Sequence, residues 1–245
     1  MQMLALYSIK GGVGKTASAV NLAAEAARDG KRVLLWDIDP QAATTFYLRS
    51  KPKVRGGGVD KLVKGKADLD RAIRETDIEG LDLLPAALGS RDLEASMETR
   101  KPSRLRKILK PVMASYDLVI LDCPPSLSAL AEQIFSSVDA LLVPVVPTTL
   151  SLRTLEQLDI HLDAVEQACP IWPFITLADR RKTLHRQVID SLSERWPRRL
   201  STTVPNASAI ERMGLERAPV GQFARSTPGG RAYAELWREI AQRLQ

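Results

Sequence analysis

A glycine-rich stretch near the N-terminus, Lys10-Gly-Gly-Val-Gly-Lys-Thr16, has the residue types needed to bind a phosphate group. Backbone N–H groups that converge at the start of a helix bind anions well, and glycines let a phosphate come close to them. An apolar run precedes this stretch and an alanine-rich helical pattern follows it, which is the context that a phosphate loop requires. We therefore expect the Lys15 ammonium to reach the β- and γ-phosphates of a nucleotide, and the Thr16 hydroxyl to ligate Mg²⁺. A chance glycine-rich turn is the alternative, and the flanking strand and helix patterns argue against it.

Carboxylates follow two further apolar runs of strand length. Asp37 ends the run that begins at Arg32, with Asp39 two residues later, and Asp122 ends the run that begins at Leu118. Ligands of a doubly wound sheet lie at the C-terminal ends of its strands, so these carboxylates are expected to face the phosphate loop. An apolar strand that ends in aspartate is the Walker B arrangement, in which the carboxylate holds Mg²⁺ through water. For Asp39 the alternative is that it only caps the next helix.

The loop departs from the standard G-x-x-x-x-G-K-[ST] pattern, because Ile9 stands at the first glycine position and Lys10 opens the loop. This is the deviant Walker A pattern. Together with Asp37-Ile-Asp39-Pro-Gln41 and Asp122-Cys-Pro-Pro-Ser126, it resembles the ParA/MinD family of ATPases, and especially its ParA/Soj branch. The resemblance continues along the whole chain.

The resemblance implies roles for particular residues. Lys10 would cross a homodimer interface to the partner's ATP, Asp39 would position or activate the attacking water, and Asp37 would help to organise the Mg²⁺ region. Pro205 and Asn206 match a segment that lines the adenine pocket. The predicted catalytic residues are thus Lys10, Lys15 and Asp39, and the predicted metal-binding residues are Thr16, Asp37 and Asp122. The predicted ATP-binding residues are Gly11, Gly12, Val13, Gly14, Lys15, Thr16, Ala17, Pro205 and Asn206.

The elements that must hold these residues alternate along the chain. We expect strands at 4–9, 32–37, 81–84, 118–122 and 140–146, with later candidates at 171–177 and 201–204. We expect helices near 17–28, 103–114, 126–137, 151–168, 183–196 and 229–244, and an exposed loop at 50–58. Continuous apolar strands separated by helices predict a three-layer, doubly wound α/β fold with a mostly parallel sheet, in a single domain over residues 1–245.

Composition narrows the class of protein. The 245 residues are 44% hydrophobic and 26% charged, as in a globular protein with a full core. No apolar run approaches the 18 residues of a membrane span. We expect neither a signal peptide nor a helix-turn-helix extension at the N-terminus, and hence no sequence-specific operator binding. The two cysteines, Cys123 and Cys169, provide neither a disulfide framework nor metal-ligand spacing, so a reducing cytoplasm is expected. Cys123 is expected to be a buried packing residue.

Positive charge is concentrated in one segment. The chain has a net charge of +6, whereas residues 180–231 contain eleven Arg or Lys and four Asp or Glu, a net charge of +7. Such a segment suggests a polyanion partner, and an ordinary solvated face is the alternative. The resemblance implies that the dimer binds DNA without sequence preference and is nucleoid-associated. The basic positions of the ParA branch lie in the region that matches residues 180–217 here. The candidate DNA contacts are Arg180, Arg181, Lys182, Arg186, Arg198, Arg199, Arg212 and Arg217.

These inferences predict an ATP-driven homodimeric switch that binds DNA non-specifically and partitions or positions a cargo, with hydrolysis stimulated by a ParB-like or adaptor protein. A MinD-like switch that cycles on membranes through a C-terminal amphipathic helix is a first rival to this prediction. The stripe from Tyr233 to Leu244 is instead expected to pack on the core, because its polar face is not lysine-rich. A metabolic ligase or amidase of the same superfamily is a second rival, and an electron carrier with a cluster held by cysteines is a third. The sequence does not identify the cargo.

Overall fold

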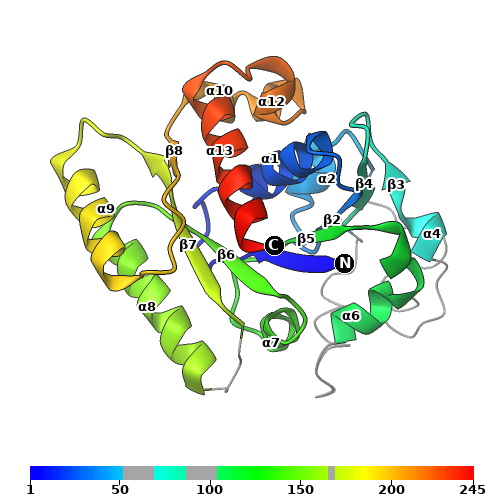
Figure 1. The fold of residues 1–245 in the computed structure, drawn as a ribbon, viewed down its shortest axis with the longest axis horizontal. Coiled ribbons are helices and arrows are strands. Elements are labelled where there is room, and N and C mark those ends of the chain that lie inside the picture. Colours follow the sequence, from blue (N-terminus) through cyan, green and yellow to red (C-terminus); the bar gives the residue numbers. More distant parts are fainter. Residues whose placement is uncertain (52–68, 87–103, 165–168) are drawn as a thin grey trace.

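A computed structural model describes residues 1–51, 69–86, 104–164 and 169–245 of the chain. Its centre is an eight-stranded sheet with the strand order β3-β4-β2-β5-β1-β6-β7-β8 (Figure 1). The strands are β1 (Gln2–Leu6), β2 (Val33–Asp37), β3 (Arg74–Glu75), β4 (Leu81–Leu84), β5 (Leu118–Asp122), β6 (Ala140–Val145), β7 (Ile171–Ala178) and β8 (Thr203–Pro205). All neighbours pair in parallel except β3, which pairs with β4 in the antiparallel direction. The prediction of a mostly parallel sheet is confirmed.

Helices cover both faces of the sheet and make the three layers visible in Figure 1. One face packs against α1 (Lys15–Arg28), α2 (Ala43–Tyr47), α10 (Ser208–Glu211), α11 (Met213–Glu216), α12 (Val220–Phe223) and α13 (Pro228–Arg243). The other packs against α4 (Leu69–Ala72), α6 (Arg104–Leu109), the 3₁₀ helix η1 (Lys110–Ser115), α7 (Ala129–Phe135), α8 (Thr149–Ala164) and α9 (Thr183–Arg195).

The strands are apolar throughout because both of their faces are buried. On β1, Met3 and Ala5 enter the core on the α7 side, whereas Leu4 and Leu6 enter the core on the α1 side. All four side chains are fully buried. Successive side chains of a strand point to opposite faces, so a central strand in a three-layer fold must be apolar at every position.

The main differences from the expected elements lie at element ends. The first strand ends at Leu6 and not at residue 9. Tyr7 is buried and Ile9 is partly buried, so the apolar pattern continues after the chain has left the strand and turned into the loop. The helix after the loop begins at Lys15, two residues earlier than expected. The expected helix at 103–114 is divided into α6 and η1, and the short antiparallel β3 was not expected. The expected loop at 50–58 lies mostly outside the described residues.

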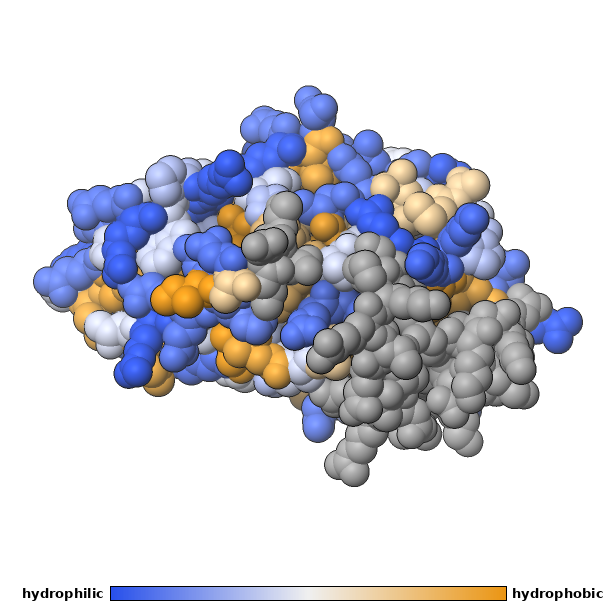
Figure 2. Space-filling view, turned by 90° about the horizontal axis from the view of Figure 1, so that it is seen from below, coloured by the Kyte–Doolittle hydropathy of each residue, from blue (hydrophilic) through white to orange (hydrophobic). Residues whose placement is uncertain are grey.

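The C-terminal helix α13 packs on the core, as predicted. Tyr233, Leu236, Trp237 and Ile240 are buried among residues of α1 and the central strands. Among the described residues no helix is both long and apolar enough to cross a bilayer. Figure 2 views the molecule from below, and on that face the coloured apolar residues form small groups between hydrophilic ones.

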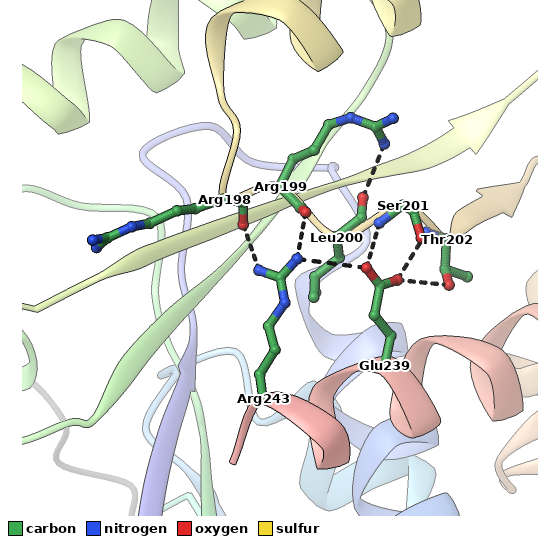
Figure 3. A network of polar contacts seen from close by, with 7 residues as sticks. All are labelled: Arg198, Arg199, Leu200, Ser201, Thr202, Glu239 and Arg243. Atoms are coloured by element: carbon green, nitrogen blue, oxygen red, sulfur yellow. Dashed lines mark hydrogen bonds and ion pairs between the residues drawn. The ribbon is translucent and has the colours of Figure 1, made fainter. Parts of the chain in front are cut away.

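The end of α13 also holds the linker between α9 and β8 (Figure 3). The Glu239 carboxylate accepts hydrogen bonds from the backbone N–H groups of residues 201 and 202, at 2.6 and 3.0 Å. Arg243 donates to the carbonyls of Arg198 and Arg199, at 2.5 and 2.6 Å. The linker carbonyls and amides are thereby fixed by side chains of the helix, while the Arg198 side chain points away from this network.

Candidate functional site

The loop between β1 and α1 has the backbone geometry of an anion site. Gly12 and Gly14 adopt positive φ angles of 73° and 84°, a region that favours glycine. A Cβ atom on Gly14 would also lie 3.3 Å from the Thr176 hydroxyl, closer than most real contacts. Gly14 caps α1 without any side-chain hydrogen bond, so the first N–H groups of this 14-residue helix remain available to an anion.

Lys15 points into the interior beside the loop. The residue is only 7% exposed, and its Nζ lies 3.4 Å from the Lys10 carbonyl oxygen, which accepts its hydrogen bond. Burial lowers the pKa of Lys15, and the nearby Asp122 carboxylate opposes this shift. The ammonium therefore lies in a poorly solvated position, where a phosphate would be a favourable partner.

The two strand-end aspartates lie side by side. Asp37 of β2 and Asp122 of β5 are partners in the strand register, and Leu6 at the end of β1 is the other partner of Asp122. Both aspartates are buried, at 2% and 0% exposure. The sheet therefore brings two carboxylates from residues 85 apart in sequence next to the first strand, which continues into the phosphate loop. The two strand-end carboxylates thus lie at one edge of the sheet, and their role at a bound phosphate stays a prediction.

Two threonines of α2 hold one oxygen of each carboxylate. Asp37 Oδ2 accepts hydrogen bonds from the Thr45 amide at 2.8 Å and from the Thr45 hydroxyl at 2.6 Å. Asp122 Oδ2 accepts one from the Thr44 hydroxyl at 2.8 Å. The other oxygens, Asp37 Oδ1 and Asp122 Oδ1, are buried and have no hydrogen-bond partner among the described residues. Buried carboxylate oxygens without donors are costly, so this pair fits a divalent cation.

The carboxyl groups have shifted pKa values that fit the same interpretation. Burial, reinforced by the charge of Asp122, raises the pKa of Asp37 to about 7. Burial raises the pKa of Asp122 to about 6, although the nearby hydroxyls of Thr44 and Thr16 oppose the shift. A cation placed between them would favour the ionised forms and reverse both shifts.

Asp39 is half-buried and lies in the loop between β2 and α2. Its Oδ1 accepts a hydrogen bond from the Gln41 amide at 2.9 Å, which forms a tight turn. Helix α2 begins only after Ala42, whose φ is 54°, and no side chain caps it. The alternative that Asp39 is the N-cap of this helix is therefore wrong, and the carboxylate remains near the strand ends.

A pocket of 640 Å³ lies where β7 and β8 end. Pro205 and Asn206 line it on one side, and Ala232 and Glu235 of α13 line it on the other. The backbone N–H of Asn206 donates to the Ala178 carbonyl at 2.9 Å, which ties this wall of the pocket to the end of β7. The volume is ample for a nucleobase, and the two residues predicted to contact adenine share this pocket.

Sequence reasoning did not find the residues that hold the carboxylates. Thr44 and Thr45 are buried polar residues just after the Asp37–Asp39 motif, and that position was the only signal that could have found them. Tyr7 was also missed: its hydroxyl donates to the Ser126 carbonyl at 2.7 Å and connects β1 to the segment after Asp122. Cys123 is fully buried, as predicted.

The candidate DNA contacts are in different environments. Arg181 pairs with Asp179 and Arg212 with Glu216. Arg217 donates to the Phe46 carbonyl. The remaining candidates are Arg180, Lys182, Arg186 and Arg198, whose side chains are exposed, and Arg199, which is half-buried. The structure therefore does not gather the eight predicted residues into one uniform group.

Comparisons with known proteins agree with this geometry. A family model described as an AAA domain, AAA_31, matches residues 1–171. The sporulation initiation inhibitor protein Soj of Bacillus subtilis is 31% identical, with 98% of each chain covered. The chromosome-partitioning ATPase Soj of Thermus thermophilus is 34% identical, with 100% of this chain and 97% of the relative covered. The chromosome partitioning protein ParA of Caulobacter vibrioides is 30% identical over 99% of this chain and 95% of the relative.

Solved structures show the same architecture. A cobyrinic acid a,c-diamide synthase from Mycobacterium smegmatis, with a bound ATP analogue and magnesium, has a TM-score of 0.85 and 28% identity. It covers all of this chain, which in turn covers 96% of the synthase chain. The cell division ATPase MinD of Pyrococcus furiosus, at 22% identity and a TM-score of 0.80 over 99% of both chains, shares the fold. The chain belongs to the ParA/MinD family of P-loop ATPases and is similar over its whole length to Soj/ParA partitioning members of that family.

Proposed function

We propose that this ATPase is a nucleotide-controlled switch that binds ATP with Mg²⁺, pairs as a homodimer, binds DNA non-specifically and positions a cargo. The observation that carries the proposal is the pair of buried carboxylates, Asp37 and Asp122, whose free oxygens lie at the strand ends beside the phosphate loop. Two of the named relatives, from Thermus thermophilus and Caulobacter vibrioides, are chromosome-partitioning proteins, which supports the positioning role.

Nucleotide binding would use groups that the structure already orients. The N–H groups at the start of α1 and the Lys15 ammonium would bind the phosphates, and Pro205 and Asn206 would contact the base. Thr16, Asp37 and Asp122 would hold Mg²⁺, directly or through water. Magnesium would supply charge compensation for the phosphates during transfer.

Hydrolysis would use Asp39 and Lys10. Asp39 lies just past the end of β2 and has one oxygen free of the Gln41 hydrogen bond, so it can orient a water molecule for attack. Lys10 is half-buried at the start of the loop, and we propose that it reaches the nucleotide of the partner subunit. Hydrolysis would then reset the dimer.

DNA binding would depend on the basic segment at 180–231, which carries a net charge of +7. Contacts to phosphates are electrostatic, so affinity should fall steeply as salt increases. Exposed side chains such as Arg186 and Arg198 are better placed for this role than Arg181 and Arg212, which pair with carboxylates. A ParB-like or adaptor protein would stimulate hydrolysis, and the protein would be cytoplasmic and nucleoid-associated.

The test is binding to a non-specific DNA duplex at a fixed salt concentration, with ATP and then with ADP. Wild type and Lys10→Ala are compared, and Lys31→Ala, which removes an exposed lysine from the connection between α1 and β2, is the matched control. The proposal predicts binding by wild type and Lys31→Ala with ATP only, loss in Lys10→Ala, and loss at higher salt. ATP hydrolysis without DNA binding in either nucleotide would refute the DNA-binding part.

A biosynthetic ligase is the second candidate, because the diamide synthase structure resembles this chain over its whole length at 28% identity. A ligase should release ADP only when a carboxylate substrate and an amide donor are present. ATP turnover by the purified protein without small-molecule substrates, stimulated by DNA and not by carboxylates, would exclude this candidate.

A further inference from the structure

The short helix α2 connects the metal-facing carboxylates to a distant part of the chain. At its start, Thr44 and Thr45 donate hydrogen bonds to Asp122 and Asp37, respectively. The helix has only five residues and no side-chain cap at its N-terminus. A helix of this length is not stable by itself, so its position depends on tertiary contacts, among them those made at its C-terminal end.

The C-terminal end of α2 is held by α11. The Arg217 Nε donates to the Phe46 carbonyl at 3.0 Å, and its guanidinium lies 4.6 Å from the centre of the Phe46 ring. In the opposite direction, Arg49 donates to the Glu216 carbonyl at 3.0 Å. A cation at a helix C-terminus hydrogen-bonds the last carbonyls and interacts favourably with the helix dipole. The Phe46 carbonyl also accepts the Arg49 N–H at 3.1 Å. We call this pair of arginine contacts the α2–α11 latch.

Both latch arginines have unusual backbones. Arg49 has a φ of 55° and Arg217 a φ of 48°, and they are two of the four non-glycine residues with positive φ in the described ranges. Such conformations cost free energy and persist when surrounding contacts require them. Ala42, which directly precedes α2, is a third, so residues with positive φ flank the helix on both sides.

We propose that Arg217 and Arg49 are positioning residues for ATP hydrolysis: by fixing α2, they fix Thr44 and Thr45, and hence the orientation of Asp122 and Asp37. The Arg217 guanidinium already contacts the carbonyl and the ring of Phe46. We therefore assign Arg217 to this positioning role in place of a DNA contact. The inference depends on the ATPase activity of the family and is independent of DNA binding.

The first measurement is hydrogen exchange of the metal-free, nucleotide-free protein. The Thr45 amide donates to Asp37, so its exchange rate reports whether α2 remains attached to the carboxylate. In Arg217→Ala we expect exchange in α2 to be about tenfold faster, the effect of losing roughly one charge-assisted hydrogen bond. Exchange in α1 should be unchanged. Arg49→Ala, as a second variant, should act in the same direction.

The second measurement is steady-state ATP hydrolysis without DNA. In Arg217→Ala, kcat should fall about tenfold and half-saturating Mg²⁺ should rise, as when outer partners of metal ligands are removed, while KM for ATP changes little. Arg217→Lys, which keeps the charge without the planar guanidinium, should be intermediate. Arg225→Ala removes an exposed arginine from the same segment and is the matched control, with wild-type values expected.

Either of two results would overturn the proposal. Unchanged exchange in α2 together with wild-type kcat in Arg217→Ala would show that the latch does not position the carboxylates. Equal acceleration of exchange in α1 and α2 would show only a general loss of stability. Because neither assay contains DNA, failure of the DNA-binding proposal would leave these results unaffected.

Discussion

The Thr45 hydroxyl makes two buried hydrogen bonds in the site, and its removal tests whether they stabilise the fold. It donates to Asp37 Oδ2 at 2.6 Å and accepts a hydrogen bond from the Ala86 amide at 2.9 Å. Thr45 is fully buried, and Ala86 is 2% exposed. The substitution Thr45→Val keeps the shape of the side chain and removes both interactions.

The expected loss of stability follows from these two bonds. A hydrogen bond to a charged group contributes about 1.5 to 3 kcal/mol, and a buried N–H group left without a partner costs about 1 to 3 kcal/mol. For Thr45→Val we therefore expect a decrease of roughly 4 kcal/mol in the free energy of unfolding at pH 8. Thr44→Val removes the single bond to Asp122 and should cost about 2 kcal/mol.

Urea denaturation of the metal-free protein at pH 8 measures both variants against wild type. The pH dependence gives a second check. At pH 5 Asp37 is protonated in the folded protein, since its pKa is about 7, so the bond lost is a neutral one. The cost of Thr45→Val should then shrink by about 1 kcal/mol. An equal or smaller cost for Thr45→Val than for Thr44→Val at pH 8 would refute the reasoning.

Two more predictions concern the same structure. Because Asp37 and Asp122 have folded-state pKa values of about 7 and 6, above the ordinary value of 3.8, the folded chain binds more protons than the unfolded chain between these values. The contribution of this pair should therefore lower the melting temperature of metal-free protein as pH rises from 4 to 7, and Mg²⁺ with ADP should restore it at pH 8. If the melting temperature of Asp37→Asn fell by the same amount between pH 4 and 7, the raised pKa of Asp37 would not be the cause. Separately, Glu239→Gln places an amide against the N–H groups of residues 201 and 202 and should cost about 1 to 3 kcal/mol of unfolding free energy with kcat unchanged. A wild-type urea midpoint would show that the network in Figure 3 contributes little.

Most of the framework of the site could be predicted from the sequence. The glycines and Lys15 lie between an apolar run and a helical pattern, and Asp37 and Asp122 each end an apolar run. These signals are local, because burial on both faces requires uninterrupted apolar strands and a phosphate loop requires glycine. Combined with the rule that ligands lie at strand C-termini, they place the chemistry at one edge of the sheet.

Element ends were less predictable. Tyr7 and Ile9 continue the apolar pattern of β1 past its last paired residue, because the loop is itself packed on the core. A hydropathy pattern records burial and not hydrogen bonding, so it cannot separate a buried strand end from a buried loop. The two-residue β3 is shorter than any pattern that periodicity can detect.

The supporting contacts were decided only by the tertiary structure. Thr44 and Asp122 are 78 residues apart, Arg217 and Phe46 are 171 apart, and no local pattern links either pair. The first contact depends on the strand order, which places β2 beside β5. The second depends on the chain after β8 packing on the α1 face of the sheet, where Arg217 reaches Phe46. The sequence by itself thus determined which residues can do the chemistry, since side-chain type and spacing are local. The fold decided what holds them, because hydrogen bonds form between groups that only the packed sheet brings within about 3 Å.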